Sequence, residues 1–263
     1  MSSTITDDDI QDFGSFTPEE YLSEYYHSVF SENDKLLRFF SRAAHAINKN
    51  ATLLEYGGGP TIYQLISFAP KVKSIHFTDY IHDNLLAVQK WINKEERAHN
   101  WTPFVEVAIE YETGRKPSHE TVTEREELVR SLLHDFGHVD ALNPAVDTTP
   151  HKQYDMVSVN FVAESISKTE EDWQKSLDSI LTYVKPGGQL CMTAIRGAEY
   201  WVSGGKQFPA FSVTAKQLER EILRRGFTLE MIEEIDAEIM DKSSAEYEGY
   251  DGMVFVLARR AAL

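Results

Sequence analysis

Residues 53–63, LLEYGGGPTIY, constrain the fold of this chain more than any other segment. An apolar run at 52–54 and the acidic Glu55 precede three consecutive glycines, and a helical pattern opens at Pro60. Glycine tolerates positive φ and lets a ligand approach the backbone closely, and proline is favoured in the first turn of a helix. The segment therefore predicts a strand, a tight turn and a helix that together hold a nucleotide-type ligand.

A second apolar run, residues 74–78, ends in Asp79. An α/β fold places a carboxylate at this point to accept hydrogen bonds from ribose hydroxyls. A dinucleotide site would have a third glycine where Ile62 stands, and Glu55 would repel a pyrophosphate. S-adenosylmethionine fits better because it carries an adenosine, a sulfonium and an ammonium group. A tight turn without any ligand is the alternative for a glycine-rich turn taken alone.

Composition excludes several function classes. The 263 residues carry a formal charge of −16, which disfavours nucleic acid and anionic membranes as partners, although solubility alone explains most of it. The single cysteine, Cys191, stands in an apolar run and is expected to be a buried, inert thiol in a reducing compartment. Neither a signal peptide nor a membrane-spanning run is visible. We expect a cytoplasmic monomer.

The pattern of the chain predicts an α/β protein. Residues 1–15 are expected to be disordered, and lid helices are expected within 17–49, the first with Thr17 as N-cap, Pro18 at its first position and Glu20 completing a capping box. Strand-like and helical segments then alternate, which indicates a doubly wound, mostly parallel sheet of seven strands with a reversed terminal pair, in one domain over 16–263. The expected strands are 52–56, 73–78, 103–109, 154–160, 188–195, 228–235 and 253–259, and the expected helices are 61–68, 83–95, 119–133, 169–183 and 214–225.

Five segments carry a resemblance to a known family. They are EYLSEYY at 20–26, EYGGGPTIYQLIS at 55–67, FTDYIHDNL at 77–85, NWTPF at 100–104 and KPGG at 185–188. With them the chain resembles the nicotinamide, phenylethanolamine and indolethylamine N-methyltransferases and their thioether S-methyltransferase relatives. The resemblance implies a class I methyltransferase fold, S-adenosylmethionine as cofactor and a small-molecule methyl acceptor.

The resemblance also implies roles for individual residues. Gly57, Gly59, Thr61 and Tyr63 would hold the methionine part, with Tyr21 and Tyr26 reaching its carboxylate. The ribose would lie against Asp79 and Asn84, and the adenine near Asp140 and Ala141, although HDFGHVDAL departs from the family pattern there. Tyr80 and Asn160 complete the predicted cofactor set.

Acceptor recognition is expected from two later segments. Glu164 follows a buried strand at a position that is acidic in the family, and with Tyr21 it is a candidate catalytic residue; a helix N-terminal Glu is the alternative reading. Two acidic substrate contacts of the family are replaced here by Ala194 and Ala198. Arg196 stands nearby and would grip an anionic acceptor, or else would pair with a surface acid. Tyr200 and Trp201 would stack on an aromatic acceptor or anchor a loop.

Other chemistries are less well supported. His134 and His138 have ligand-like spacing, but Gly137 interrupts a helix there and no zinc motif is present, so no metal is expected. The predicted function is methyl transfer to the nitrogen of a small amine, pyridine or other N-heterocycle, with a sulfur or oxygen acceptor as the alternative. A nicotinamide-dependent oxidoreductase and a non-catalytic cofactor-binding protein are the alternatives from other classes.

Overall fold

The computed structural model describes residues 12–262 except 151, 241, 243 and 245–246. Its centre is a seven-stranded sheet in the order β3-β2-β1-β4-β5-β9-β8. Strands β1 to β5 pair in parallel, whereas β9 is antiparallel to both of its neighbours. The strands are β1 (Ala51–Tyr56), β2 (Val72–Asp79), β3 (Leu133–His138), β4 (Tyr154–Asn160), β5 (Val184–Arg196), β8 (Phe227–Asp236) and β9 (Gly252–Arg260). This confirms the predicted fold class and the reversed terminal pair.

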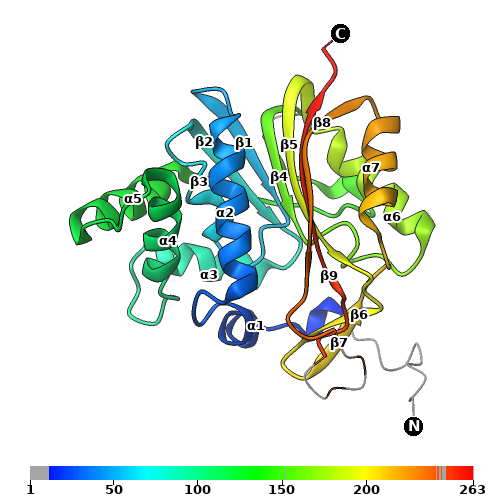
Figure 1. The fold of residues 1–263 in the computed structure, drawn as a ribbon, viewed down its shortest axis with the longest axis horizontal. Helices are drawn as coiled ribbons and strands as arrows, with labels where there is room; N and C mark the ends of the chain where they lie inside the picture. Colours follow the sequence, from blue (N-terminus) through cyan, green and yellow to red (C-terminus); the bar gives the residue numbers. More distant parts are fainter. Residues whose placement is uncertain (1–11, 151, 241, 243, 245–246, 263) are drawn as a thin grey trace.

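Helices cover both faces of the sheet (Figure 1). One face carries α2 (Ser31–His45), α3 (His82–Ile92), α4 (Thr102–Thr113) and α5 (His119–Leu132), and the other carries α6 (Glu170–Leu181) and α7 (Ala215–Arg224). The short helix α1 (Pro18–Tyr25) lies at one end of the sheet beside the hairpin of β6 (Tyr200–Ser203) and β7 (Lys206–Pro209). Short 3-10 turns stand at η2 (Phe13–Ser15), η3 (Tyr63–Leu65) and η4 (Pro144–Val146).

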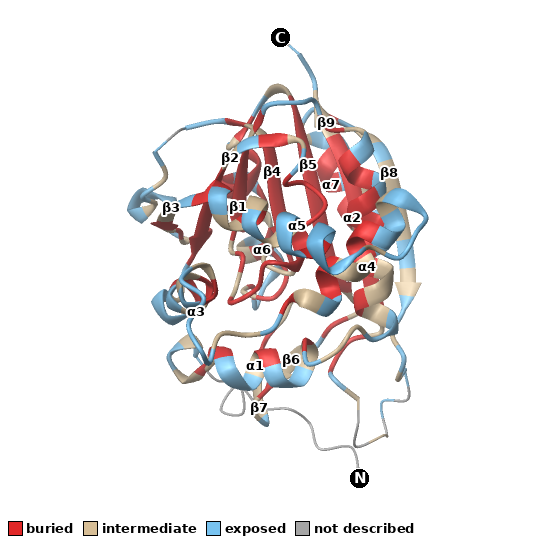
Figure 2. Cartoon of the chain, turned by 90° about the vertical axis from the view of Figure 1, so that its left-hand side faces the viewer, coloured by how far each residue is buried: buried red, intermediate tan, exposed pale blue. Residues whose placement is uncertain are grey.

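The side chains of the central strands point alternately to the two faces of the sheet, and this divides the hydrophobic core into two clusters. Leu53, Met156 and Cys191 belong to the cluster under α2 and α4, whereas their neighbours Leu54 and Val157 belong to the cluster under α6 and α7. Successive side chains of a strand point to opposite faces, so these strands must be apolar on both sides. Figure 2 shows the result, with buried strands between helices whose outer sides are exposed. The buried Cys191 agrees with the expected inert thiol.

Two predicted elements are wrong. The strand predicted over 103–109 is wrong, because these residues form most of α4, whose buried residues Phe104, Val105, Ala108 and Ile109 follow a helical period. The helix expected over 61–68 is reduced to η3 and irregular turns. There the Thr61 hydroxyl donates to the Gly58 carbonyl at 2.8 Å, a side-chain bond to the backbone that competes with helical bonding.

The N-terminal predictions are partly confirmed. Helix α1 begins at Pro18 as expected, but Thr17 accepts no backbone N–H, because its hydroxyl donates to the Glu20 carboxylate instead of forming a capping box. Most of the expected disorder of residues 1–15 falls on 1–11, which lie outside the described residues, while η2 gives 13–15 a defined turn. No helix in the described part of the chain is long and apolar enough to cross a bilayer.

Candidate active site

The glycine turn after β1 has the conformation that its sequence predicts. Gly57 and Gly59 have φ values of 67° and 62°, in the left-handed region that favours glycine. A Cβ on Gly57 would lie 2.6 Å from a methyl of Val162, so this position also needs glycine for space. The Gly58 N–H donates to the Thr78 carbonyl at 2.9 Å, which ties the turn to the end of β2.

Asp79, the last residue of β2, fixes the geometry of this turn. Its carboxylate accepts the N–H of Gly59 at 2.8 Å, the N–H of Ile81 at 2.7 Å and the side-chain amide of Asn84 at 2.9 Å. Burial raises the pKa of Asp79 above its ordinary value, although these three donors oppose the shift. Asp79 therefore connects the glycine turn, the end of β2 and the start of α3.

Glu55 lies beneath the same turn and is fully buried. Burial raises its pKa to about 8, against the hydrogen bonds that it accepts from Gln64 and Asn160, both at 3.2 Å. The neutral carboxyl is therefore the favoured form at pH 7 in the free protein.

A cavity of about 290 Å³ opens where β1, β2 and β4 end. Every residue predicted to bind the cofactor lines it: Tyr21, Tyr26, Gly57, Gly59, Thr61, Tyr63, Asp79, Tyr80, Asn84, Asp140, Ala141 and Asn160. Side chains that are distant in the sequence thus meet at the carboxyl edge of the sheet, where ligands bind in open α/β folds. We call this space the cofactor cavity.

The cofactor cavity has unused polar groups that fit S-adenosylmethionine. The side-chain oxygen of Asn84 is buried and has no hydrogen-bond partner among the described residues, so a ribose hydroxyl can donate to it. The backbone at Gly59 is open, because a Cβ there would meet no atom within 4 Å. Asp140 accepts the N–H of Leu142 at 2.9 Å and so closes a turn. This turn lies at the end of the cavity where the resemblance predicts the adenine.

Aromatic residues that the sequence analysis missed cover this cavity. Phe13 and Phe16 of the N-terminal segment line it and contact Trp201 and Phe208 of the β6–β7 hairpin, with ring centroids 5.9 to 6.5 Å apart. A signal for the hairpin was present, since Gly204 and its neighbouring glycine separate two runs with aromatic residues. Phe13 of η2 and Trp201 of the hairpin thus form part of the wall of the cofactor cavity.

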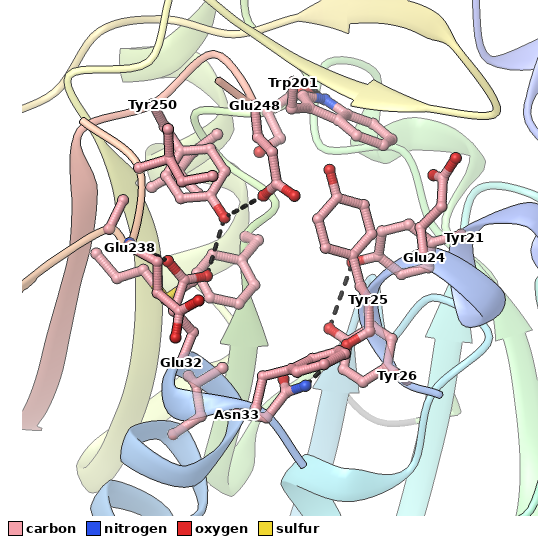
Figure 3. Close-up of a pocket in the computed structure, with 18 residues that line it drawn as sticks. Tyr21, Glu24, Tyr25, Tyr26, Glu32, Asn33, Trp201, Glu238, Glu248 and Tyr250 are labelled. Atoms are coloured by element: carbon pink, nitrogen blue, oxygen red, sulfur yellow. Dashed lines mark hydrogen bonds between the residues drawn. The ribbon is translucent and has the colours of Figure 1, made fainter. Parts of the chain in front are cut away.

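A second cavity, of about 320 Å³, adjoins the first. Tyr21, Tyr26, Phe161, Ser165 and Trp201 line both cavities and so mark their junction. We call this second space the acceptor cavity. Among the described residues that line it, apolar side chains combine with four carboxylates, and no Lys, Arg or His is present. The carboxylates are Glu24, Glu32, Glu238 and Glu248 (Figure 3).

Glu164, which the sequence predicts to contact the acceptor, is not among the residues that line either cavity. It is fully buried behind the wall and accepts the N–H of Ile195 at 2.8 Å, which joins the loop after β4 to β5. It is not at a helix N-terminus either, because this loop consists of turns. Burial raises its pKa to about 7. Ser165, its neighbour in the sequence, lines both cavities, whereas Glu164 lines neither, and its contact with the acceptor stays a prediction.

The predicted anion-binding role of Arg196 is wrong. Its guanidinium donates to Glu234 at 3.0 Å, to Asp236 at 2.5 Å and to the Asp251 carbonyl at 3.1 Å, and it lines neither cavity. The alternative of pairing with surface acids is the one observed. The sequence around Arg196, the last residue of β5, does not reveal that β8, two strands away in the sheet, presents the carboxylates of Glu234 and Asp236 to this side chain.

We therefore expect Arg196→Ala to leave the Michaelis constant of the acceptor within about twofold of wild type, because ion pairs at the surface contribute little beyond local stability. Steady-state kinetics with the acceptor varied at saturating methyl donor would measure this. A rise of about tenfold or more would restore the anionic-acceptor hypothesis.

The two aromatic residues at the start of β6, Tyr200 and Trp201, differ in their position relative to the cavities. Trp201 lines both cavities, and its indole N–H donates to the Ser165 carbonyl at 3.1 Å, in agreement with a place at the acceptor. Tyr200 lines neither cavity and its ring contacts that of Tyr247, which favours the alternative of a loop anchor over stacking on the acceptor.

His134 and His138, whose spacing resembles that of metal ligands, have other surroundings in the structure. Both residues lie in strand β3. Between them, a carboxylate oxygen of Asp135 lies 2.9 Å from Nε2 of His76, and the ring of His138 packs on that of Tyr80. Within the described ranges, no group of three or more His, Cys, Asp or Glu side chains is arranged to hold a metal ion.

Solved structures of methyltransferases share this fold. DhpI in its complex with SAH superposes with a TM-score of 0.55 at 12% identity, covering 93% of this chain and 91% of that one. N-methyltransferase NodS from Bradyrhizobium japonicum, in complex with S-adenosylhomocysteine, gives 0.54 at 10% identity, covering 94% and 93%. These two likenesses show the fold of this chain.

The family follows from the sequence as a whole. The model of the NNMT/PNMT/TEMT family matches residues 5–261, so the chain belongs to this family. Nicotinamide N-methyltransferase of Sus scrofa is 27% identical over 97% of each chain. Indolethylamine N-methyltransferase of Mus musculus is 27% identical over 93% of each. The resemblance stated from the five segments is thereby confirmed.

Proposed function

We propose that this enzyme transfers the methyl group of S-adenosylmethionine to the nitrogen of a small amine held in the acceptor cavity. The observation that carries the proposal is the junction of the two cavities at Tyr21, Tyr26, Phe161, Ser165 and Trp201. A methyl donor on one side of these residues and a nucleophile on the other satisfy the main demand of the reaction, which is alignment without water.

When bound, S-adenosylmethionine supplies an activated methyl on sulfur. The lone pair of the acceptor nitrogen forms the new N–C bond while the S–C bond breaks, and the electron pair of that bond returns to sulfur. An amine must be unprotonated to attack, so its ammonium form first releases a proton. Carboxylates are the bases that the acceptor cavity offers, with Glu24 on the same side as Tyr21 in Figure 3.

The charge of the acceptor cavity supports an amine over an acid. Its four carboxylates make no ion pair with any Lys, Arg or His among the described residues, so a carboxylate ligand would add to their repulsion. A protonated amine that enters would relieve it. The names of the relatives, which are N-methyltransferases of nicotinamide and of indolethylamine, support nitrogen as the methylated atom.

Both cavities draw on the whole chain. Tyr21 comes from α1, and Gly59 follows β1. Tyr250 lies in the connection between β8 and β9, and Met253 lies in β9. This distribution supports one functional domain over residues 16–263, with α1 and α2 as its N-terminal cap.

The test combines binding and turnover on one sample. Calorimetric titration should show S-adenosylhomocysteine binding with a micromolar dissociation constant, and transfer of labelled methyl should follow with arylalkylamines or aliphatic amines but not with carboxylic acids of similar size. Methylation of thiols alone would replace nitrogen by sulfur as the acceptor. Absence of S-adenosylhomocysteine binding would contradict the proposed function altogether.

A further inference from the structure

The junction of the two cavities is mainly aromatic. Five residues line both cavities, and four of them, Tyr21, Tyr26, Phe161 and Trp201, carry aromatic rings, which we call the junction rings. The ring of Tyr21 stands at 74° to that of Trp201, with centroids 6.1 Å apart, and at 55° to that of Tyr26, with centroids 5.5 Å apart. These three rings therefore form adjoining walls rather than a parallel stack, on one side of the acceptor cavity in Figure 3.

Phe161 reaches the junction through a strained backbone. Its φ of 56° lies in the left-handed region, where a bulky residue is rare. The Phe161 N–H donates to the Thr193 carbonyl at 2.9 Å, and this bond continues the pairing of β4 with β5. The other non-glycine residues with positive φ in the described part of the chain, Asn50 and Lys94, line neither cavity. Strained residues are concentrated at ligand sites, which points to a function for the ring of Phe161.

The polar side chains of the junction have partners within the protein. The hydroxyls of Tyr21 and Tyr26 lie 3.4 Å apart. The Trp201 indole N–H donates to the Ser165 carbonyl at 3.1 Å, and the Ser165 hydroxyl donates to Glu164 at 3.4 Å. A reacting nitrogen that keeps N–H groups would have to compete with these bonds.

The junction rings suit a cation that has no N–H groups. An aromatic face attracts a cation, most strongly away from water, and aromatic cages are the usual sites for quaternary ammonium groups. Within the described residues, Arg130 lies over the ring of Trp91 and Lys242 over that of Tyr247, and no such contact involves a junction ring. A quaternary nitrogen donates no hydrogen bond, so it needs none of the acceptors that are already paired.

We propose that the natural acceptor is a tertiary amine, which the enzyme converts to a quaternary ammonium product whose nitrogen lies against the junction rings. This inference rests on the proposed function and deepens it. The ammonium form of the acceptor first gives its proton to a carboxylate of the acceptor cavity. The nitrogen lone pair then forms the new N–C bond, while the bond between sulfur and the methyl group breaks and its electron pair returns to sulfur.

The rings act on the charge that this step creates. The nitrogen ends with four carbon substituents and a positive charge that no loss of a proton can remove. Part of that charge is present in the transition state, so rings that attract it stabilise the transition state more than the neutral amine. The same rings would gain less from a primary amine, whose product keeps N–H groups that need acceptors.

The first experiment measures the preference of the junction for a quaternary nitrogen. The enzyme saturated with S-adenosylhomocysteine is titrated calorimetrically with choline and with its neutral analogue, in which a tert-butyl group replaces the trimethylammonium group. We expect choline to bind about tenfold or more tightly, the magnitude of a desolvated contact between a cation and a ring. At about 0.5 M salt the preference should persist within about twofold, because salt screens the attraction of the exposed Glu24, Glu238 and Glu248 but not a contact inside the junction.

Variants that replace a ring by an aliphatic side chain locate the effect. Trp201→Leu and Phe161→Leu should each reduce the preference for choline to within about threefold, because leucine lacks the negative face of an aromatic ring. Tyr200→Leu is the control, since Tyr200 precedes Trp201 in β6 but lines neither cavity. Thermal unfolding of each variant, and its affinity for S-adenosylhomocysteine, would show that the fold and the cofactor cavity are intact.

The second experiment counts the methyl groups on the product. The primary, secondary and tertiary amines of one carbon skeleton are compared, and the skeleton is one that the enzyme methylates in the test of the proposed function. Mass spectrometry should show the quaternary ammonium as the product of the tertiary amine. The kcat/KM of the tertiary amine should equal or exceed that of the primary amine.

Equal binding of choline and its neutral analogue by the wild type would overturn the inference while leaving the proposed function in place. A preference that survives both leucine variants would have the same meaning, and so would methylation of the primary amine, or of pyridines, without that of the tertiary amine. Failure to bind S-adenosylhomocysteine would instead contradict the proposed function, and this inference with it.

Discussion

Replacing Gly58 with alanine is expected to lower the free energy of unfolding by about 3 kcal/mol, because the position has no room for a methyl group. A Cβ there would lie 2.6 Å from Cε2 of Phe77 and 2.9 Å from Cγ of Glu55, and it would also meet the Phe77 Cζ. Both neighbours are fully buried, so neither can move aside into solvent. Denaturant unfolding of the cofactor-free protein measures this loss.

Gly59→Ala is the matched control for Gly58→Ala. Gly59 has a φ of 62° but open space around its Cβ position, so it should lose only the left-handed backbone penalty of about 1 kcal/mol. A double-mutant cycle with Phe77→Ala tests the cause, since removing the ring should relieve part of the Gly58→Ala cost. Additive effects of Gly58→Ala and Phe77→Ala would show that the overlap with the ring is not the cause.

The cofactor cavity was predictable because its signals are local. A glycine turn with positive φ at Gly57 and a carboxylate at the end of β2 each follow from residues within a few positions of each other. The topology then places Asp79, Asn84 and Asp140 at the same edge of the sheet, because parallel strands end on the same side. The resemblance to the family added the lid tyrosines.

The acceptor cavity was not predictable in the same way. Glu24 and Glu32 lie near the N-terminus, whereas Glu238 and Glu248 lie in the connection between β8 and β9. Each looks like a solvated surface acid in an acidic chain, and only packing α1 and α2 against the C-terminal strand pair places them together. The error at Arg196 has the same origin, since its partners come from β8.

The misassigned segment at 103–109 shows a different limit. Its valines and isoleucine favour a strand locally, and short apolar runs cannot be assigned by periodicity alone. The packing of α4 on α2 and α5 decides for the helix. Strand β3, which occupies the edge of the sheet instead, is LHDFGH, with polar residues at three of its six positions, and so gave no continuous apolar signal.

Asp79→Asn is expected to weaken the binding of S-adenosylhomocysteine by about 100-fold or more. The carboxylate accepts three hydrogen bonds within the protein, and hydrogen bonds to a charged group contribute about 1.5–3 kcal/mol each. A carboxamide has nearly the same shape, but its NH2 group must face either the Gly59 N–H or the Ile81 N–H. Two N–H groups that face each other repel, and this displaces the glycine turn. The substitution also removes one acceptor for the ribose hydroxyls. A loss of about 2.7 kcal/mol in binding free energy already weakens binding 100-fold.

Calorimetric titration of S-adenosylhomocysteine into each variant measures the effect of Asp79→Asn, and unfolding of the free proteins separates it from a loss of stability. Asp83→Asn is the matched control, since Asp83 lies exposed in the first turn of α3 and lines neither cavity. Asn84→Ala should have an intermediate effect of about tenfold, because it removes one donor to Asp79 and one unpartnered oxygen from the cavity. If Asp79→Asn bound within threefold of wild type, the ribose would have to be held elsewhere, and Asp79 would serve only to connect the glycine turn to α3.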